Sequence, residues 1–349
     1  MLNENTPKIE YRHSPQLAEF FQQNSLSLLV SSYQAQRVLL FSAKNEHTLR
    51  MLVRVLPKPM GICLSGKRLA IASKQSIWYF SGEQSIVGED GNALPYDLTF
   101  VPRYSVVTGD ILAHQIAFSG THTIVVNTRF SCLAHVSTEA SFVPFWKPSF
   151  IDVLAAEDRC HLNGLALLDG KPKYVTALGI SNEKEGWRAL KSHGGCVIDI
   201  DSNEILCQDI SMPHSPLVYS GKLWLLESGK GLLITIDPKT GQKTEVCKFP
   251  GYTRGLSFYK HFAFVGLSKI REKQLFSDLP IQQNNEDLEC GISIVDLSNG
   301  SLIGTILFTK GVEELFDLSI IVGCPKAHLI GFEDDMIDGV FLVPKMQTK

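Results

Sequence analysis

The sequence has 349 residues, is 44% hydrophobic and 20% charged, and carries a net charge of −3 with a pI near 6.4. This length allows a large buried core, and the slightly acidic balance argues against nucleic acid or an anionic membrane as a partner. No run of 18 apolar residues could span a bilayer, the polar N-terminus lacks the apolar core of a signal peptide, and eight scattered cysteines indicate reduced thiols. We therefore expect a cytoplasmic protein; its oligomeric state is left open.

The two ends of the chain are predicted to share one sheet. Residues 1–25 are expected to form a leader of helix or coil, followed by three strands at 27–32, 37–43 and 48–56 that have no inner strand of their own. Near the other end, the strand around Glu314 has no strands after it. Because an unpaired edge favours association with other chains, we expect this strand to join the first three, with residues 325–349 as a tail packed outside.

The middle of the chain repeats a four-strand unit, which is most complete between Ser211 and Phe249. Six segments align on the apolar core of the first strand of each unit: KPMGICL (58–64), LAHQIAF (112–118), HLNGLAL (161–167), MPHSPLV (212–218), YTRGLSF (252–258) and VEELFDL (312–318). A repeat of roughly 50 residues built from short strands and turns indicates a propeller. The prediction is an all-β fold: a six-bladed β-propeller over residues 26–324, with N- and C-terminal strands sharing the closing blade.

The first strand of each blade lines the channel of a propeller, so one position of the repeat should bring six side chains to the channel mouth. In the alignment these are Met60, His114, Asn163, His214, Arg254 and Glu314. His161 lies two residues before Asn163, and the alternation of a strand puts both on the same face.

Imidazoles next to a carboxylate are typical of a catalytic metal site with one open position. We therefore predict that His114, His214 and His161 bind one divalent metal, with Glu314 as the alternative third ligand, and that Arg254, Glu314 and Asn163 are catalytic groups. Zinc or iron(II) suits these ligands best, manganese also fits, and calcium remains an option although it prefers an oxygen-only shell. The alternative is that each histidine only satisfies buried backbone groups.

A second set of side chains follows the second strand of each blade and should also lie near the mouth. It includes Tyr33, Asn127, Arg129, Glu227 and Lys269, and a long loop at 181–195 adds Trp187. Together with Arg254, the basic members favour a small anionic molecule as substrate or ligand. Alternatively, these basic groups pair with neighbouring carboxylates in structural networks, and the aromatic side chain packs on a blade.

One segment resembles a known propeller family. The phrase HLNGLALLDGKPKYVTALG (161–179) is similar to the NGLA segment of the senescence-marker and gluconolactonase family, whose six-bladed propellers are related in shape to strictosidine synthase. The resemblance implies that Asn163 is a ligand of a divalent metal. The family's other ligands are carboxylates and amides, whereas His114 and His214 occupy the corresponding places here, which argues against lactone hydrolysis.

Over nearly its whole length the chain resembles a group of conserved hypothetical bacterial proteins, through the strings GDILAH, EDRCHLNGLA, SMPHSP, GYTRGL and GLSKIRE. That resemblance implies no activity. The peptidyl-hydroxyglycine amidating lyase is similar in a different way, since it places three histidines on separate blades around a zinc ion with an arginine nearby.

The sequence therefore predicts a metal-dependent enzyme, with hydrolase or lyase chemistry favoured, that acts on a small anionic substrate at the channel mouth. Two alternatives remain open: a non-catalytic propeller that binds a small ligand or a protein partner, and an iron(II)-dependent oxygenase.

Overall fold

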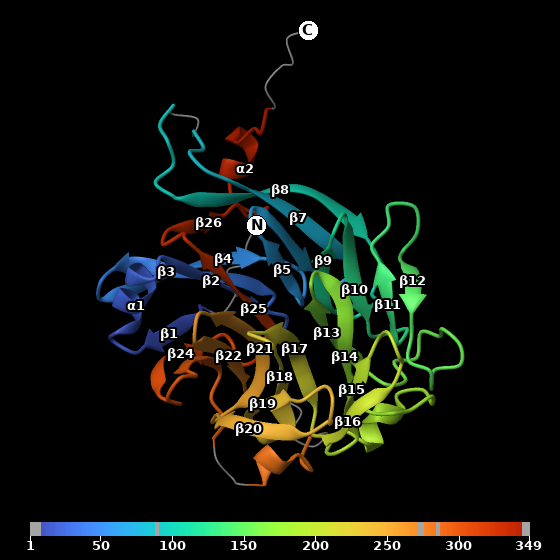
Figure 1. Cartoon of the computed structure of the whole chain (residues 1–349). Helices are drawn as coiled ribbons and strands as arrows, with labels where there is room; N and C mark the ends of the chain where they lie inside the picture. Colours follow the sequence, from blue (N-terminus) through green and yellow to red (C-terminus); the bar gives the residue numbers. More distant parts are fainter. Residues whose placement is uncertain (1–7, 88–90, 271–275, 284–286, 344–349) are drawn as a thin grey trace.

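The computed structural model describes residues 8–87, 91–270, 276–283 and 287–343, and within them six β-sheets stand around a central axis (Figure 1). Strands hold 51% of the residues and helices 6%, so the all-β, six-bladed propeller prediction is confirmed. The first seven residues of the expected leader and the last six of the expected tail fall outside the described residues.

Each blade contains four antiparallel strands ordered from the channel outward, and five of the blades follow the chain without a break. The first three blades are β5 (Ile62–Ser65), β6 (Arg68–Ala72), β7 (Ser76–Glu83) and β8 (Leu98–Val107); β9 (Ala113–Ser119), β10 (His122–Asn127), β11 (Cys132–His135) and β12 (Val143–Trp146); and β13 (Leu162–Leu168), β14 (Lys171–Ala177), β15 (Gly195–Asp199) and β16 (Ile205–Ile210). The fourth and fifth are β17 (Pro213–Tyr219), β18 (Lys222–Glu227), β19 (Leu232–Ile236) and β20 (Lys243–Lys248); and β21 (Tyr252–Tyr259), β22 (Phe262–Ser268), β23 (Gly291–Asp296) and β24 (Leu302–Lys310).

The sixth blade closes the ring with strands from both ends of the chain, as predicted. Its inner strand β25 (Asp317–Val322) pairs antiparallel with β2 (Leu26–Ser32), with Ile320 opposite Leu28. The outer strands are β3 (Arg37–Asn45) and β4 (Thr48–Val55). All seven residues of β2 are buried, since this strand lies inside the sheet and between two neighbouring blades.

Short elements outside the six blades extend the sheets on either side of the closure. In the leader, β1 (Glu10–His13) pairs with β24 as a fifth strand, and α1 (Leu17–Gln23) buries its apolar face. In the tail, β26 (Ala327–Leu329) pairs parallel with β8, and α2 (Met336–Gly339) follows it. No helix in the described part of the chain is long and apolar enough to cross a membrane.

The hydrophobic core lies between neighbouring blades. Leu29 and Leu40 of the closing blade, for example, pack in one cluster with Ile71 and Phe80 of the first blade, and similar clusters fill the other spaces between blades. Because each sheet covers its neighbours, its strands carry apolar side chains on both faces, which explains the runs of Leu, Ile and Val in the repeat.

Side chains near the channel join the second blade to the third, the fourth to the fifth and the sixth to the first. The side chain of Gln115 accepts a hydrogen bond from the backbone N–H of Leu165 at 2.8 Å, and that of Ser215 accepts one from Gly255 at 3.1 Å. In the closing blade, Asp317 accepts from the N–H of Ile62 at 2.8 Å. These three contacts hold neighbouring inner strands together directly beneath the channel mouth.

Candidate functional site

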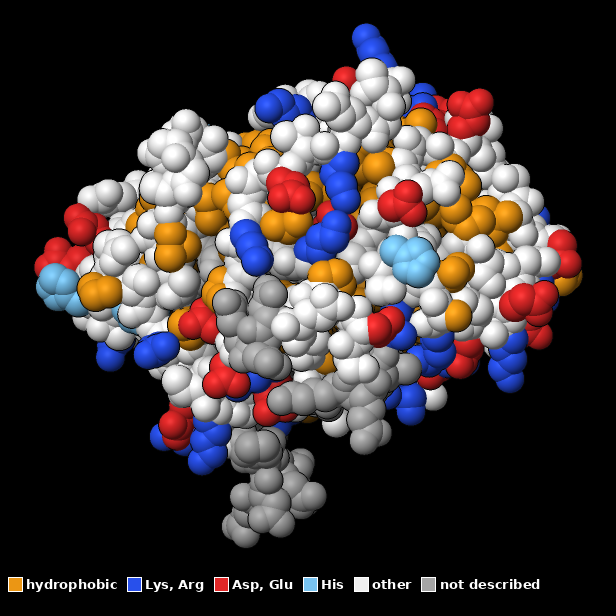
Figure 2. Space-filling model, turned by 90° about the horizontal axis from the view of Figure 1, so that it is seen from below, with side chains coloured by type: hydrophobic (Ala, Val, Ile, Leu, Met, Phe, Trp, Pro, Cys, Tyr) orange, Lys and Arg blue, Asp and Glu red, His pale blue; other side chains and the backbone are white. Residues whose placement is uncertain are grey.

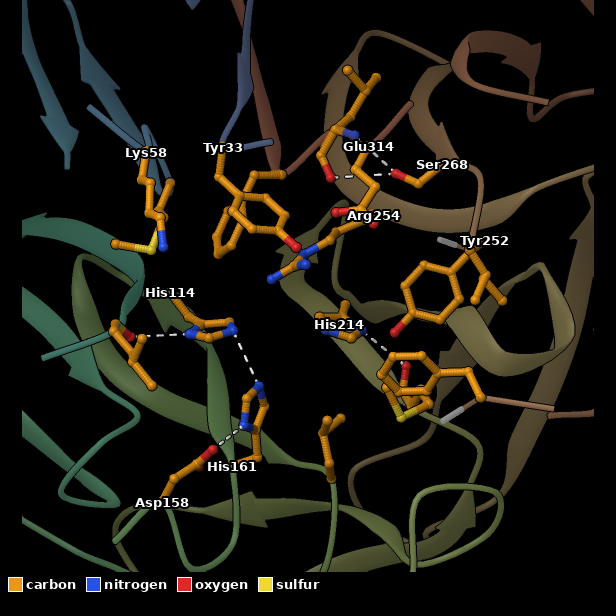
Figure 3. Close-up of a pocket in the computed structure, with 18 of the residues that line it drawn as sticks. Tyr33, Lys58, His114, Asp158, His161, His214, Tyr252, Arg254, Ser268 and Glu314 are labelled. Carbon is orange, nitrogen blue, oxygen red and sulfur yellow. Dashed lines mark hydrogen bonds and ion pairs between the residues drawn. The ribbon is translucent and has the colours of Figure 1, made fainter. Parts of the chain in front are cut away.

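A cavity of about 540 Å³ lies at the mouth of the channel, a volume in the range of small-molecule sites. All six blades contribute to its wall, and Figure 3 shows His114, His161, His214, Arg254, Tyr33 and Lys58 converging on it from different sides. The inner-strand alignment therefore brings four of its five polar members, His114, His214, Arg254 and Glu314, together at one place.

The same backbone geometry recurs just before four inner strands. Lys58, Leu112, His161 and Met212 occupy equivalent places in the repeat and all have left-handed backbone angles, with φ of 44°, 52°, 49° and 53°. Such angles are costly for residues other than glycine and persist where the surrounding structure enforces them. All four residues line the cavity, so this turn points the side chain of each blade inward.

The hydrogen bonds of His114 fix which ring nitrogen faces the cavity. Its Nδ1 lies 3.0 Å from the carbonyl oxygen of Leu112 and 2.8 Å from the Thr128 hydroxyl, which itself donates to the carbonyl oxygen of Leu162. A carbonyl oxygen only accepts, so Nδ1 carries the proton. The Nε2 atom of neutral His114 therefore presents a lone pair to the cavity.

His214 repeats this arrangement two blades further on. Its Nδ1 lies 3.0 Å from the carbonyl oxygen of Met212 and 3.0 Å from the hydroxyl of Ser228, which donates to the carbonyl oxygen of Thr253. The tautomer is therefore the same as that of His114. Outer contacts that fix a ring nitrogen in this way are typical of metal-binding histidines.

His161 is held by a carboxylate and faces His114. Its Nδ1 donates to Oδ2 of Asp158 at 2.7 Å, and the same oxygen accepts from the indole N–H of Trp187 at 3.1 Å. The Nε2 atoms of His161 and His114 lie 3.2 Å apart, with their rings at 82° (Figure 3). With both protons on Nδ1, a further proton or a cation between the two Nε2 atoms would remove the repulsion between their lone pairs.

The surroundings disfavour a positive charge on two of the histidines. Burial, with added repulsion from His161 and Arg254, holds the pKa of His114 well below its usual range. Burial and the charge of Arg254 do the same to the pKa of His214. Both rings are therefore neutral at physiological pH and available as acceptors or metal ligands.

The predicted set of three metal-binding histidines is only partly assembled. Within residues 8–87, 91–270, 276–283 and 287–343, no group of three His, Cys, Asp or Glu side chains is arranged to hold a metal ion. His114 and His161 form a close pair, whereas His214 lines the same cavity from another blade.

Arg254 reaches across the cavity toward the closing blade. Its guanidinium carbon lies 3.7 Å from the ring centre of Phe316 and 6.0 Å from that of Tyr33, which are favourable cation–π positions. Glu314 also lines the cavity, three residues before β25 begins. Figure 3 shows Arg254 pointing between Tyr33 and His214, where it could bind an anion.

The cavity differs from the outer surface in its charge. On the face shown in Figure 2, basic and acidic side chains are interspersed and hydrophobic groups form small patches. Among the described residues, the cavity wall holds five basic side chains (Lys58, Lys74, Arg188, Arg254 and Lys269) and three acidic ones (Asp110, Asp158 and Glu314). The predicted residues Lys269 and Trp187 lie in this wall, and the excess of basic groups favours an anionic ligand.

Four residues of the predicted site lie elsewhere. Asn163 is buried deeper in the channel, where its amide donates to the carbonyl oxygen of Pro213 and accepts from Thr176. Asn127 is fully buried and accepts from the N–H of Phe130. None of these contacts involves the cavity at the mouth.

The remaining two do not line the cavity and form ion pairs, in one case with Asp110 of the cavity wall. Arg129 pairs with Asp110 at 3.1 Å. Glu227 is fully buried and pairs with Lys230 at 2.8 Å and with Lys243 at 3.0 Å. These ion pairs agree with the structural alternative, and a role of either residue in binding stays a prediction.

Sequence reasoning missed several residues of the wall, among them Lys58, Asp158 and Tyr252. A signal was present for Lys58, which stands at the same repeat position as His161. Tyr252 follows the same rule, since it lies two residues before Arg254. Asp158 had no such signal, because its contact with His161 depends on left-handed backbone angles at both residues.

These features define a six-bladed propeller with a histidine-rich cavity at the channel mouth. A family model described as a domain of unknown function (DUF4915) matches residues 15–330, so the chain belongs to that family. A search of curated proteins gave no match.

Solved structures share the fold. A chain of the nidogen/laminin complex superposes with a TM-score of 0.51 at 11% identity, covering 85% of this chain and 99% of that one. A protein of unknown function from Bacteroides caccae gives the same TM-score and coverage at 8% identity. Identities this low show the propeller fold alone. The resemblance to gluconolactonases therefore rests on the segment around Asn163 and stays a prediction.

Proposed function

We propose that the cavity is the active site of a metal-dependent enzyme, a hydrolase or lyase, that acts on a small anionic substrate. The observation that carries this proposal is the 3.2 Å separation of the Nε2 atoms of His114 and His161, both of which present lone pairs. Two nitrogens bound to one tetrahedral zinc ion at 2.0–2.1 Å are about 3.3–3.4 Å apart, so the pair fits a shared metal.

In the proposed reaction, each residue of the cavity would have a separate role. His114 and His161 would hold the metal, which would polarise a substrate oxygen or lower the pKa of water. Asp158 and Trp187 keep the ring of His161 in place. His214 presents a neutral Nε2 to the cavity and is suited to accept a proton or to serve as a further ligand. Arg254 would hold the anionic group of the substrate.

A non-catalytic binding site is the second candidate, and a specific observation favours it. The described residues do not form a three-ligand metal group, and one proton shared between His114 and His161 would satisfy both rings without any metal. The cavity would then bind an anion through Arg254 and hydrogen bonds.

Metal analysis with asparagine variants separates the two candidates. Asparagine keeps a donor near the position of Nδ1 and removes Nε2, so His114→Asn and His161→Asn preserve the outer hydrogen bonds and delete the ligand atoms. His47→Asn is the matched control, because its side chain is 82% exposed. After zinc loading and desalting, we expect about one bound ion in the wild type and the control and none in the two variants. Zinc that persists in both variants would overturn the proposal.

A further inference from the structure

The wall of the cavity is divided into an apolar side and a basic side. The apolar side comes from the third, fourth and fifth blades, where one cluster of packed side chains reaches the cavity through Leu178, Trp187, Met212, Tyr252, Ile270 and Phe276. These residues belong to the third blade (Leu178 and Trp187), the start of the fourth (Met212) and the fifth (Tyr252, Ile270 and Phe276). They form a continuous surface suited to an apolar group.

The basic side comes from the first blade. Lys58 precedes β5 and Lys74 follows β6, and both line the cavity. Arg254 approaches the same side, because its guanidinium lies against Phe316 of the closing blade. Figure 3 shows Lys58 and Tyr252 on opposite sides of the cavity, with Arg254 between them.

Lys58 and Met212 show the division most directly. They hold the same repeat position, share the left-handed turn with φ of 44° and 53°, and lie on the first and fourth blades, which face each other across a six-bladed ring. The same left-handed turn therefore places a cation on one side of the cavity and a thioether on the other. A ligand spanning the two would meet opposite chemistry at its two ends.

Other charged groups also lie near the apolar side, and Lys269 lines the cavity next to Ile270. Arg188 stacks on Trp187 and forms an ion pair with Glu185 at 2.8 Å. Asp158 accepts hydrogen bonds from His161 and Trp187. The charge of Arg188 is therefore compensated, whereas Oδ1 of Asp158 is buried without a hydrogen-bond partner among the described residues.

We infer that the ligand of this cavity is an amphiphilic anion: a carboxylate or phosphate head that binds at Lys58, Lys74 and Arg254, joined to an apolar, ring-sized body that packs on Met212, Tyr252 and Trp187. The histidine pair lies between the two sides. This inference rests on the proposed function for the identity of the cavity as a ligand site, and it adds the class of ligand.

Binding of a molecule and its two halves tests the inference. The probes are 3-phenylpropionate, acetate as the anionic half and 3-phenylpropanol as the apolar half, measured by calorimetry on zinc-loaded protein whose metal content is recorded. Burial of only two methylene equivalents strengthens binding about tenfold. We therefore expect 3-phenylpropionate to bind at least about tenfold more tightly than either half, and phenylpropyl phosphate will show whether the head is better as a phosphate.

Two variants locate the halves. Lys58→Met should weaken 3-phenylpropionate binding at least several-fold and leave 3-phenylpropanol unchanged, whereas Met212→Gln should weaken both phenyl compounds and leave acetate unchanged. Met212→Leu keeps the apolar volume and should bind all three probes like the wild type. This control shows whether weaker binding by Met212→Gln comes from the polar side chain or from a change of the fold at this position.

Two results would overturn the inference: 3-phenylpropionate binding no more tightly than acetate, or both variants weakening all three probes alike. Metal content is read separately, so zinc bound without any preference among the probes would refute the divided cavity and leave the metal site standing. The probe preference without zinc would refute the metal proposal alone.

Discussion

The Nε2 atoms of His114 and His161 face each other at 3.2 Å although each ring has its proton on Nδ1. The carbonyl oxygen of Leu112 holds one proton and the carboxylate of Asp158 the other. Two lone pairs at this distance repel unless a cation or a further proton lies between them. This relationship connects the propeller repeat, which brings two neighbouring blades together, to the chemistry proposed for the cavity.

Closure of the ring should depend on the buried side chains of β25. Leu318 is 3% exposed and packs in the cluster between the closing and fifth blades, whereas Val322 at the end of the same strand is 59% exposed. Leu318→Ala should lower the free energy of unfolding by about 2–4 kcal/mol, as measured by urea denaturation. Val322→Ala, the control, should change it by less than about 0.5 kcal/mol. Equal effects would contradict the closure.

Gly164 of the NGLA segment should tolerate no side chain. A Cβ atom at this position would lie 2.2 Å from Cδ of Pro216 in the fourth blade and 2.3 Å from the hydroxyl of Thr176 in the third blade. Gly164→Ala should destabilise the protein by about 1–3 kcal/mol or more through overpacking. Gly300→Asn, at an open turn with φ of 74°, is the control and should be nearly neutral in a thermal melt. An unchanged melting temperature for Gly164→Ala would show that the blades can separate.

Much of the cavity could be predicted because the repeat fixes which side chains share a face. His114, His214 and Arg254 share one position of the repeat, His161 lies two residues before that position, and all four line the cavity. The contact between the side-chain amide of Asn163 and the carbonyl oxygen of Pro213 could not be predicted, because it depends on how closely the third and fourth blades approach each other. Asn163 of the motif that resembles gluconolactonases thus joins the third blade to the fourth, and its role as a metal ligand stays a prediction.

Ion pairs were the harder part of the site to predict. Arg129 and Glu227 stand at the right place in the repeat, but loops and outer strands supply their partners Asp110, Lys230 and Lys243. Sequence spacing gives no measure of such distances. A charged residue at a blade mouth is therefore a weaker indicator of function than a histidine on an inner strand.

Asp317 should make stability depend on pH. Burial raises the pKa of Asp317 to about 7, although two backbone N–H donors and Arg254 lower it. The folded chain therefore holds this proton more tightly than the unfolded chain, and the resulting stabilisation is complete below about pH 4 and is lost as the pH rises through 7. Asp317→Asn does not titrate. From pH 5 to pH 8, the wild type should lose about 1–3 kcal/mol relative to this variant in urea unfolding. A constant difference would contradict the shift.

Arg254 should bind the anionic group through its planar guanidinium. Arg254→Lys keeps the charge and removes the two-pronged donor, so we expect affinity for 3-phenylpropionate to fall by about 1.5–3 kcal/mol with the zinc content unchanged. Arg103→Lys on the exposed outer strand β8 is the control and should bind like the wild type. If Arg254→Lys also binds like the wild type, Arg254 only supports Phe316 and the anion site lies elsewhere.

The most direct measurement of the metal site is anomalous diffraction from crystals soaked in zinc. The proposed function predicts one strong anomalous peak between His114 and His161, at about 2.0–2.1 Å from both Nε2 atoms. The same soak of His114→Asn crystals should give no peak there. Wild-type crystals that show no peak, with the two Nε2 atoms still joined by a hydrogen bond near 3.2 Å, would contradict the metal site and leave the histidines as a hydrogen-bonded pair in a binding cavity.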